Sequence, residues 1–282
     1  MTRANGPHGQ VPWPAARSLP ISCVVITRDA ASQVGATLAS AACCAELLVL
    51  DSGSTDDTVA IARAHGARVE HHPFLGFGPQ KRHAVALASY DWILSLDADE
   101  CLDDDAVRGL ASLDLSDDRT CWEWHRRTFI DRHEVRHGPW GHERVVRLFN
   151  RSRSGFTDHR VHERVVAAAP ARTAPGSILH FSFVDVADVI SRSIRYATPK
   201  AAILRDLGEC TPAWMLPLRG LASFTKSYLL QGGWRDGAAG FVVALSRVID
   251  STLARASLLV DTPPAGITPP SEAKPPVPPP PA

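Results

Sequence analysis

The sequence predicts an α/β protein with a mostly parallel sheet, an antiparallel extension and a C-terminal helical region. Three observations support this fold class. Apolar, β-branched runs alternate with helical patterns over residues 21–97, which is typical of a parallel sheet with helices on both faces. Between residues 121 and 183, strand-like runs follow one another directly, which favours antiparallel pairing. Residues 186–260 are helical in pattern.

The first half of the chain is expected to supply four strands and four helices. The continuous apolar run "ISCVVIT" predicts a buried strand. In "STDDTVAIARAHG", Ser54 or Thr55 is the expected cap, Asp56 and Asp57 complement the helix dipole, and Gly66 ends the helix. We expect strands at residues 21–27, 46–51, 67–72 and 91–97, and helices at 33–42, 54–66, 80–89 and 103–113.

The second half is expected to change from strands to helices. Strands are predicted at residues 121–130, 142–150, 159–166 and 176–183. Residues 185–208 form one helix, or two with a break near Pro199, and two further helices separate near Gly232 and Gly233. The expected organisation is a flexible tail (1–20), an α/β domain (21–185), a helical and possible membrane-associating region (186–260) and a Pro-rich disordered tail (261–282).

The composition is that of a globular protein, with 45% hydrophobic and 21% charged residues. Thirty basic residues balance thirty acidic ones, so no polycationic surface for nucleic acid is indicated. The six cysteines show no CxxC pairing, which favours a reducing compartment. The N-terminus has no hydrophobic signal core, and no uninterrupted apolar run reaches the length of a membrane span. We therefore expect a cytoplasmic protein, peripheral on the inner membrane face at most.

Acidic residues crowd the end of one predicted strand. "WILSLDADE" places Asp97, Asp99 and Glu100 directly after an apolar run, and like charges this close need neutralising by helix amides, a cationic side chain or a metal ion. Asp51 also follows an apolar strand, and ligands of such sheets gather at the carboxyl ends of strands. Mg²⁺ prefers a few carboxylates together with substrate phosphates and water. The pattern therefore suits a metal–diphosphate complex.

Two other interpretations of the acidic run were weighed. Asp103, Asp104 and Asp105 fit the start of a helix, as its cap and first-turn charges, rather than a site. Haloacid-dehalogenase-type phosphatases also place Asp-x-Asp after an apolar strand. They carry it on the first strand, followed by Thr or Val, whereas Glu100 and Cys101 follow here, several strands into the chain.

Four ordered motifs resemble glycosyltransferase family 2, in the branch that builds lipopolysaccharide inner core. They are "VVITRDA" (24–30), "VLDSGSTDDT" (49–58), "GFGPQKRHAVALASYDWILSLDADE" (76–100) and "VHERV" (161–165). "QGGWRDGAAGFVVAL", from Gln231, is similar to the C-terminal segment of that branch, so the likeness runs from about Ile21 to Leu259. The resemblance implies a GT-A (Rossmann-like) fold and a nucleotide-sugar donor.

The resemblance also implies roles for individual residues. It assigns donor contacts to Thr27, Asp29, Asp51, Lys81 and Asp97, and ligation of Mg²⁺ or Mn²⁺ to Asp97 and Asp99. Such enzymes are inverting and need a base, for which Glu163 in "VHE" is the candidate. The alternative for Glu163 is an ion pair with Arg160 or Arg164. His180 in "LHFSF" could ligate the metal, although a lone strand histidine is more often simply hydrogen-bonded.

For several further residues, the sequence allows either a functional or a structural role. Arg144 and Arg147 suit a diphosphate or a phosphorylated acceptor, or a solvent-facing strand edge. The C-terminal helices mix apolar residues with Arg219, Lys226 and Arg247. They would lie in a membrane interface, cover the sheet or form a dimer. Resemblance favours the membrane surface, because that branch glycosylates lipid-anchored acceptors.

The predicted function is an inverting, metal-dependent hexosyl or heptosyl transfer from a nucleotide sugar to a lipid-linked saccharide of the lipopolysaccharide core. One alternative is a polyisoprenyl-phosphate glycosyltransferase. Another is a nucleotidyltransferase of similar fold, although "TRDAASQ" after the first strand lacks the expected glycine-rich loop. A non-enzymatic sugar-nucleotide-binding module is the third, and the presence of Asp97, Asp99 and Glu163 argues against it.

Overall fold

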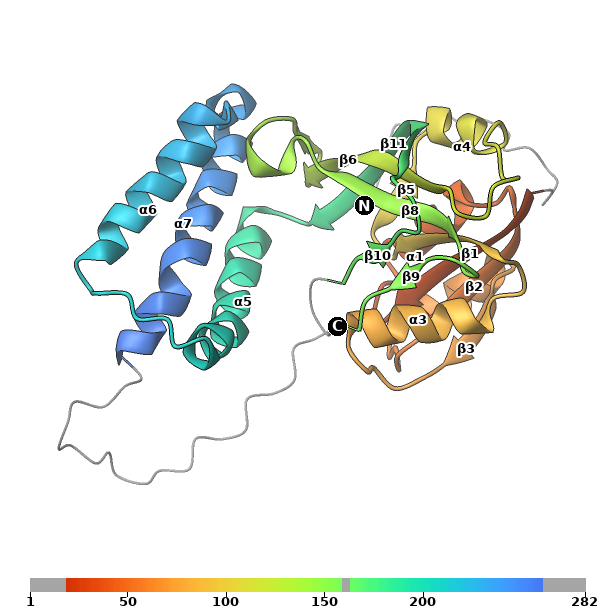
Figure 1. The fold of residues 1–282 in the computed structure, drawn as a ribbon, viewed down its shortest axis with the longest axis horizontal. Coiled ribbons are helices and arrows are strands. Elements are labelled where there is room, and N and C mark those ends of the chain that lie inside the picture. Colours follow the sequence, from red (N-terminus) through yellow and green to blue (C-terminus); the bar gives the residue numbers. More distant parts are fainter. Residues whose placement is uncertain (1–18, 159–162, 261–282) are drawn as a thin grey trace, which may run out of the picture. The chain divides into compact units, whose positions relative to one another are not determined.

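A computed structural model describes residues 19–158 and 163–260 of the chain (Figure 1). The chain forms two compact units. The first comprises residues up to 125 and 144–179, and the second comprises 126–143 and the residues from 180 onward. Residues 1–18 and 261–282 of the predicted tails, Arg160, and Val161 and His162 of the fourth motif lie outside the described residues. The units divide the chain at other points than the expected domain limits, which stay a prediction.

The first unit contains the alternating strands and helices. Its strands are β1 (Leu19–Thr27), β2 (Cys44–Asp51), β3 (Arg68–His71), β4 (Trp92–Asp97), β5 (Glu100–Leu102), β8 (Arg144–Asn150), β9 (Gly155–Phe156) and β10 (Val165–Val166). Its helices are α1 (Val34–Ser40), α2 (Thr58–Ala64), α3 (Phe77–Leu87) and α4 (Asp104–Leu110). Strands β6 (Cys121–Ile130) and β11 (Arg172–Phe183) run from this unit into the second.

The main sheet has the order β3-β2-β1-β4-β8-β6-β11-β5, and β7 (His133–Val135) pairs with β6. Strands β3, β2, β1 and β4 are parallel neighbours. Strand β8 joins β4 and β6 in antiparallel register, and β6 and β7 are antiparallel as well. The predicted parallel sheet with an antiparallel extension is therefore confirmed, as is the GT-A arrangement.

Strand register brings the carboxyl ends of the parallel strands together. Thr27 of β1 faces Asp51 of β2, and Ile26 faces Asp97 of β4. Asp51 also faces His71 at the end of β3. Because these strands run in the same direction, residues far apart in sequence end at one edge of the sheet.

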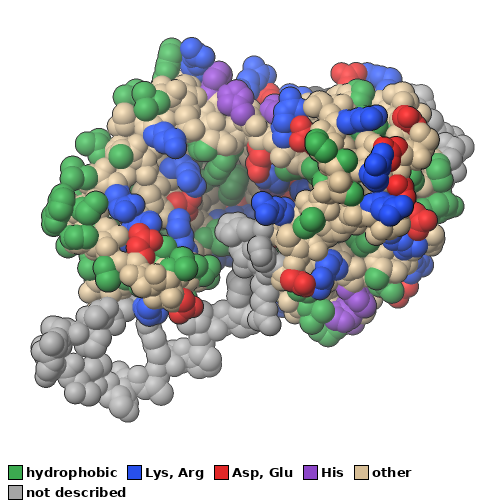
Figure 2. Space-filling model, viewed as in Figure 1, with side chains coloured by type: hydrophobic (Ala, Val, Ile, Leu, Met, Phe, Trp, Pro, Cys, Tyr) green, Lys and Arg blue, Asp and Glu red, His purple; other side chains and the backbone are tan. Residues whose placement is uncertain are grey.

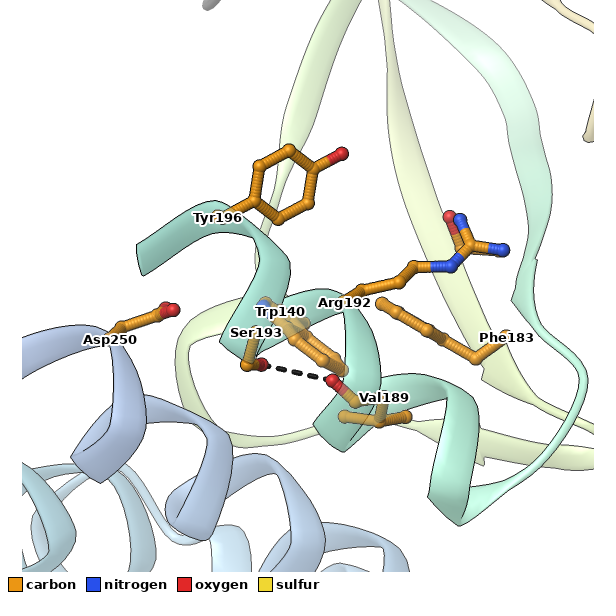
Figure 3. A pocket seen from close by; sticks show the side chains of 8 residues that line it. Trp140, Phe183, Val189, Arg192, Ser193, Tyr196 and Asp250 are labelled. Carbon is orange, nitrogen blue, oxygen red and sulfur yellow. Dashed lines mark hydrogen bonds between the residues drawn. The ribbon is translucent and has the colours of Figure 1, made fainter. Parts of the chain in front are cut away.

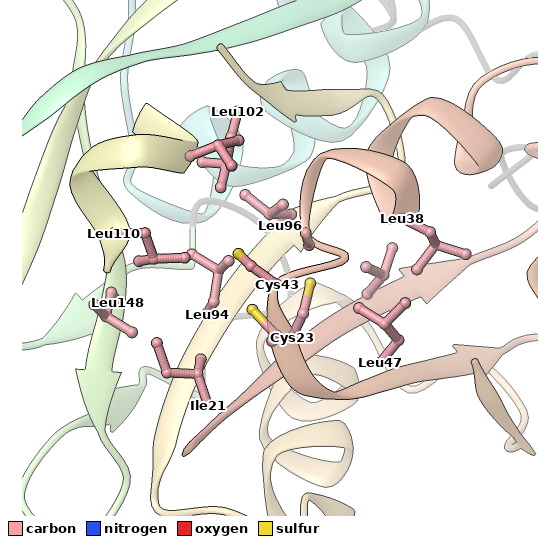
Figure 4. Close-up of a cluster of buried hydrophobic side chains, with 14 of the residues drawn as sticks. Ile21, Cys23, Leu38, Cys43, Leu47, Leu94, Leu96, Leu102, Leu110 and Leu148 are labelled. Atoms are coloured by element: carbon pink, nitrogen blue, oxygen red, sulfur yellow. The ribbon is translucent and has the colours of Figure 1, made fainter. Parts of the chain in front are cut away.

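The core lies on both faces of the sheet. Alternate residues of β1 point to opposite faces, so Cys23 and Val25 join the cluster that includes α1 and α4 (Figure 4). Val24 joins the cluster that includes Ala84 and Val85 of α3. All six cysteines are free thiols, and burial raises the pKa of Cys23. Cys23 and Cys121 are buried, as small core residues would be.

Two helix starts differ in how well they were predicted. Asp103 caps α4, and its side chain accepts a hydrogen bond from the Ala106 amide, as expected. The predicted capping of α2 by Ser54 or Thr55 is wrong, since α2 begins at Thr58 with Asp57 in the cap position. The polar residues before α2 instead contact the loop after β1, as described below.

The second unit is mainly helical. It contains η1 (Gly138–Trp140), α5 (Val186–Asp206), α6 (Met215–Thr225), a π-helical turn η2 (Lys226–Leu230), η3 (Gly233–Asp236) and α7 (Gly237–Val260). Helix α5 is a single helix with Pro199 inside it. The expected separation near Gly232 and Gly233 is confirmed between η2 and η3. Here the backbones approach closely: a Cβ on Gly240 would meet the Gly233 carbonyl oxygen at 1.8 Å.

Helix α7 packs against α5 and α6. Residues 233–260 are long and apolar enough to cross a membrane by length and composition, and about a third of the apolar window is buried inside the protein. This is the only such helix in the described ranges. A helix of a soluble bundle meets the same criteria, so composition alone does not assign α7 to a membrane.

Candidate active site

The loop after β1 is held by the loop after β2. Asp29, with a left-handed φ of 51°, accepts hydrogen bonds on Oδ1 from the Thr55 amide at 2.7 Å and the Thr55 hydroxyl at 3.1 Å. The Asp29 amide donates to Ser54 Oγ at 2.9 Å. Aspartate is one of the few residues that adopt this conformation readily. The first two sequence motifs therefore form one structure at the sheet edge.

Asp51 is buried at this edge and fully hydrogen-bonded. Its Oδ1 accepts from Thr27 Oγ1 at 3.1 Å and from Ser54 Oγ at 2.5 Å, and its Oδ2 accepts from the amides of Gly53 and Ser54, both at 2.9 Å. Burial alone would raise the pKa of Asp51, but these hydrogen bonds outweigh burial and lower it. Asp51 is thus a fixed anion, and His71 Nδ1 lies 3.9 Å from its Oδ2.

A chain of five charged side chains extends from Asp97. Lys81 of α3 binds Asp97 Oδ1 at 2.6 Å and Glu163 Oε1 at 2.7 Å. Arg147 of β8 binds Asp97 Oδ2 and Glu100 Oε1, both at 2.6 Å through the same Nη2. The Asp97 amide donates to Glu100 Oε2 at 3.1 Å. Among the described residues, three carboxylates therefore contact two cations in this network.

Both cations of this network are removed from water. The Lys81 side chain is 4% exposed and lies over the Phe156 ring, with Nζ 5.4 Å from its centroid. Arg147 is buried as well. Burial opposes its charge, but the attraction of Asp97 and Glu100 is stronger, so the pKa of Arg147 is raised. The buried Arg147 Nε forms no hydrogen bond with any described residue.

The crowded acidic run thus finds cationic partners within the protein. Lys81 and Arg147 neutralise Asp97, and Arg147 also neutralises Glu100. Asp99 lies in the turn between β4 and β5 and is half-buried. Within the described ranges, no group of three or more His, Cys, Asp or Glu side chains could hold a metal ion unaided. Two adjacent carboxylates fit only a cation that takes its other ligands from phosphate and water.

The predicted residues do not all fall in one place. Thr27, Asp29 and Asp51 join the strand-end loops, while Lys81, Asp97 and Glu163 join the ion network. His180 belongs to the second unit, where its Nε2 lies 2.8 Å from Ser182 Oγ. Its role as a metal ligand therefore stays a prediction.

Two participating residues, Arg147 and Glu100, are not assigned to the site by the sequence, while Glu163 is assigned to it as the candidate base. Glu163 forms an ion pair with Lys81, and the alternative pairing with Arg160 lies outside the described residues. Arg147 was weighed against a solvent-facing strand edge, and it is buried. Glu100 was treated only as part of the acidic run, yet its side chain is fully buried. The alternation of charge and apolar residues in "RVVRLF" was the one available signal for Arg147.

The second unit has a separate cavity of about 180 Å³ between β11, α5 and α7 (Figure 3). Trp140 stacks on Phe183 with ring centroids 5.1 Å apart, and the Arg192 guanidinium lies 5.4 Å from the Phe183 centroid. Ser193 donates a hydrogen bond to the Val189 carbonyl. Arg192 likewise pairs with Asp188 one turn away, so these two polar side chains of the wall bond within α5.

The parallel sheet with polar strand ends, and its antiparallel extension, define a GT-A-type α/β protein. Residues 22–171 match the family described as "Glycosyl transferase family 2". This is more than half of the chain, and the chain belongs to that family.

Two relatives are similar over most of their length. One is the "Lipopolysaccharide core biosynthesis glycosyltransferase LpsC" of Rhizobium meliloti (strain 1021), which is 29% identical over 85% of this chain and 92% of its own. The other is an "Uncharacterized glycosyltransferase" of Rickettsia felis, 27% identical over 85% of this chain and 90% of its own.

Among solved structures, glucosyl-3-phosphoglycerate synthase from Mycobacterium tuberculosis, in complex with Mn²⁺, UDP and glucosyl-3-phosphoglycerate, overlaps part of the chain. The overlap has a TM-score of 0.31 and 27% identity, and it covers 40% of this chain and 44% of that one.

Proposed function

We propose that the protein is an inverting, metal-dependent glycosyltransferase that moves a hexosyl or heptosyl group from a nucleotide sugar to a lipid-linked saccharide. The observation that carries this proposal is the ion network in which Lys81 bridges Asp97 and Glu163 at 2.6 and 2.7 Å. It joins the acidic strand end to the candidate base through one lysine. A structural ion pair would need only one carboxylate for that lysine.

The strand-end loops would hold the nucleoside. Asp51 would hydrogen-bond the base or ribose in place of one of its present donors, and Thr27 and Asp29 would border the same space. Lys81 would face the diphosphate. Because Lys81 already spans two carboxylates, a diphosphate oxygen can replace one of them without leaving the ammonium unpaired.

Asp97 and Asp99 would hold Mg²⁺ or Mn²⁺. A bound divalent ion would stabilise negative charge on the departing nucleoside diphosphate. The protein's own contribution would be to orient Asp97, through Lys81 on one oxygen and Arg147 on the other. Fixed charges of this kind need no rearrangement during the reaction.

Glu163 would act as the general base. Its carboxylate would take the proton of the acceptor hydroxyl while that oxygen forms a bond to the anomeric carbon. The bond from this carbon to the diphosphate oxygen breaks, and its electron pair leaves with the diphosphate. A single displacement of this kind inverts the anomeric centre. Lys81, whose Nζ lies 2.7 Å from Glu163 Oε1, would hold this carboxylate in position.

The acceptor is proposed to be lipopolysaccharide core. This rests on the likeness to a relative named as a lipopolysaccharide core biosynthesis glycosyltransferase. The site of action would then be the cytoplasmic face of a membrane, with the protein peripheral on its surface. The free state of all six cysteines suits a reducing compartment.

A panel of nucleotide sugars tests the proposal. Release of nucleoside diphosphate is measured with Mn²⁺, with Mg²⁺ and with chelator. We expect metal-dependent turnover of at least one sugar nucleotide, and a decrease of about a hundredfold or more in Asp99→Ala. Asp104→Ala, which removes a carboxylate from the first turn of α4, is the matched control and should keep full turnover. Full activity in chelator, or in Asp99→Ala, contradicts the metal role.

A further inference from the structure

The outer face of α6 and η2 carries a row of exposed, large apolar side chains. Trp214, Leu218, Leu221, Leu229 and Leu230 are between 55% and 80% exposed, and we call them the outer stripe. Their spacing of three and four residues from Trp214 to Leu221 places them on one side of a helix. Figure 2 shows hydrophobic side chains gathered along the outer side of α6. Isolated exposed leucines are ordinary, but a continuous helical row is not.

The opposite face of α6 is already used for packing on α7. A Cβ on Gly220 would lie 3.3 Å from Val248 Cγ1, so the two helices are in close contact there. Phe224 and Tyr228 both pack edge-on against Phe241 of α7, with centroids 5.7 and 6.0 Å apart. The outer stripe is therefore not needed to hold the helical bundle together.

The charged residues of the segment that bears the stripe have one sign, and the neighbouring Glu209 is paired with Arg255. Residues 211–235 contain no Asp or Glu, and their charged residues are Arg219, Lys226 and Arg235. Arg219 and Lys226 are seven residues apart, so they lie along the same side of the helix, beside the row of leucines. Lys226 is exposed and forms no ion pair with any described residue. Arg235 lies over the exposed Trp234 ring at 5.4 Å.

We propose that the outer stripe lies in the interfacial region of a lipid bilayer with anionic headgroups, with α6 parallel to the membrane surface. Leucine side chains would enter the acyl boundary, while the flanking cations would meet lipid phosphates. Trp214, at the start of the stripe, is a residue type that favours this depth. A second copy of the chain is a poorer occupant, because it would bring the same cations against one another.

The proposal assigns the membrane contact to α6, whereas length and composition alone point to α7. Helix α7 meets the criteria of a membrane span, but it packs on α5 and α6, and its Phe241 and Leu245 are less exposed than any residue of the stripe. Helix α6 would therefore bear the membrane contact. The inference specifies the membrane surface of the proposed function, and rests on that function only for the lipid-linked nature of the acceptor.

Vesicle flotation tests the inference with the full chain and no donor. We expect binding to vesicles that contain phosphatidylglycerol, and weak binding to vesicles of phosphatidylcholine alone. In Leu218→Gln/Leu221→Gln, the partition coefficient should fall at least about tenfold, because two leucines no longer enter the acyl boundary. Lys226→Gln should bind less tightly at low salt and match the parent at high salt, where charge attraction is screened.

The matched control is Ile203→Gln/Leu207→Gln on α5 and its C-terminal cap. These residues are 54% and 74% exposed, so the change in surface hydrophobicity is similar. This variant should bind vesicles as the parent does. Equal loss in both variants, or unchanged binding in the stripe variant, overturns the inference. A dimer of the parent in sedimentation equilibrium that is lost in the stripe variant also overturns it, in favour of self-association.

Donor turnover without vesicles separates this inference from the proposed function. The stripe variant should release nucleoside diphosphate at the parent's rate, since no residue of the stripe belongs to the ion network. Vesicle binding without any donor turnover in the parent would contradict the proposed function and leave the membrane contact standing. Donor turnover in a parent protein that does not bind vesicles would contradict the membrane contact and leave the proposed function standing.

Discussion

Two carboxylate clusters lie at opposite ends of the strand pair β1–β2, and they differ in how their charge is satisfied. Glu46, near the start of β2, accepts hydrogen bonds from Ser22 Oγ at 2.5 Å, from the Ser89 amide at 2.7 Å and from Arg68 at 2.8 Å. This is one buried carboxylate with several donors. At the other end of the sheet, Asp97, Glu100 and Glu163 are in contact with Lys81 and Arg147, and each of these two cations lies between two carboxylates.

Under the proposed function, the Glu46 cluster is structural and the Asp97 network binds the donor and its metal ion. Glu46 has donors in excess, so nothing further is needed to stabilise its charge. In the Asp97 network, Lys81 is shared between Asp97 and Glu163, and Arg147 is shared between Asp97 and Glu100. Under the proposed function, a further cation would arrive at this network with the substrate. The comparison therefore predicts opposite consequences for equivalent substitutions at the two ends.

The largest effect is expected for Arg147→Met, which leaves Asp97 and Glu100 without their shared buried cation. We expect the free energy of unfolding to fall by about 3–5 kcal/mol, because an unpaired charge remains in the interior. Urea denaturation at neutral pH measures it. Arg144→Met on the same strand is the control: its partner Glu123 is at 3.4 Å on the surface, and the loss should be at most about 1 kcal/mol.

Glu163→Gln tests whether the Asp97 network takes part in glycosyl transfer, a role not expected of the Glu46 cluster. We expect transfer to an acceptor to fall about a hundredfold or more, because the amide cannot take the acceptor proton. Donor affinity and unfolding free energy should change little, since Lys81 keeps Asp97 as a partner. Steady-state transfer and donor titration measure the two quantities. Unchanged transfer would remove Glu163 from the base role.

Glu46→Gln should show the converse behaviour, with full donor turnover and a loss of about 1–2 kcal/mol in unfolding free energy at neutral pH. Burial raises the pKa of Glu46, but hydrogen bonds from Ser22, Ser89 and Arg68 outweigh this and lower it from 4.5 to about 2. Its contribution is therefore fully present above pH 4.5 and is lost as the pH falls towards 2.

The pH dependence of unfolding checks the Glu46 prediction. Parent and Glu46→Gln should differ at neutral pH and converge under acid conditions, because the protonated carboxyl of the parent then resembles the amide. A constant difference across this range would show that shape rather than charge decides the role of Glu46. Impaired donor turnover in this variant would weaken the distinction between the two clusters.

The fold was predictable where the local pattern and the tertiary structure agree. Continuous apolar runs predicted β1, β2 and β4, since strands buried on both faces need no polar alternation. The start of α2 was misplaced because Ser54 and Thr55 have two possible partners. The sequence prediction paired Ser54 or Thr55 with a backbone amide of the following helix, which is a local contact. In the structure these two residues instead hydrogen-bond with Asp29 and Asp51, and Asp29 comes from another segment of the chain.

The sequence predicted which residues lie at the strand ends of the candidate site, but it did not predict the ion pairs that connect them. Register in a parallel sheet places Thr27, Asp51 and Asp97 at one edge, and the sequence shows each directly after an apolar run. The Arg147 contacts span 47 and 50 residues and depend on an antiparallel strand that follows several loops. No spacing rule encodes such a pair. The place of Lys81 between Asp97 and Glu163 likewise needs the three-dimensional structure.

The most direct test is the anomalous diffraction of Mn²⁺ in crystals soaked with manganese and a nucleoside diphosphate sugar. The account predicts a single strong peak beside Asp97 and Asp99, with the diphosphate between the ion and Lys81. A peak elsewhere, or a bound diphosphate with Asp97 still held by both Lys81 and Arg147 and no ion beside it, would contradict the proposed active site.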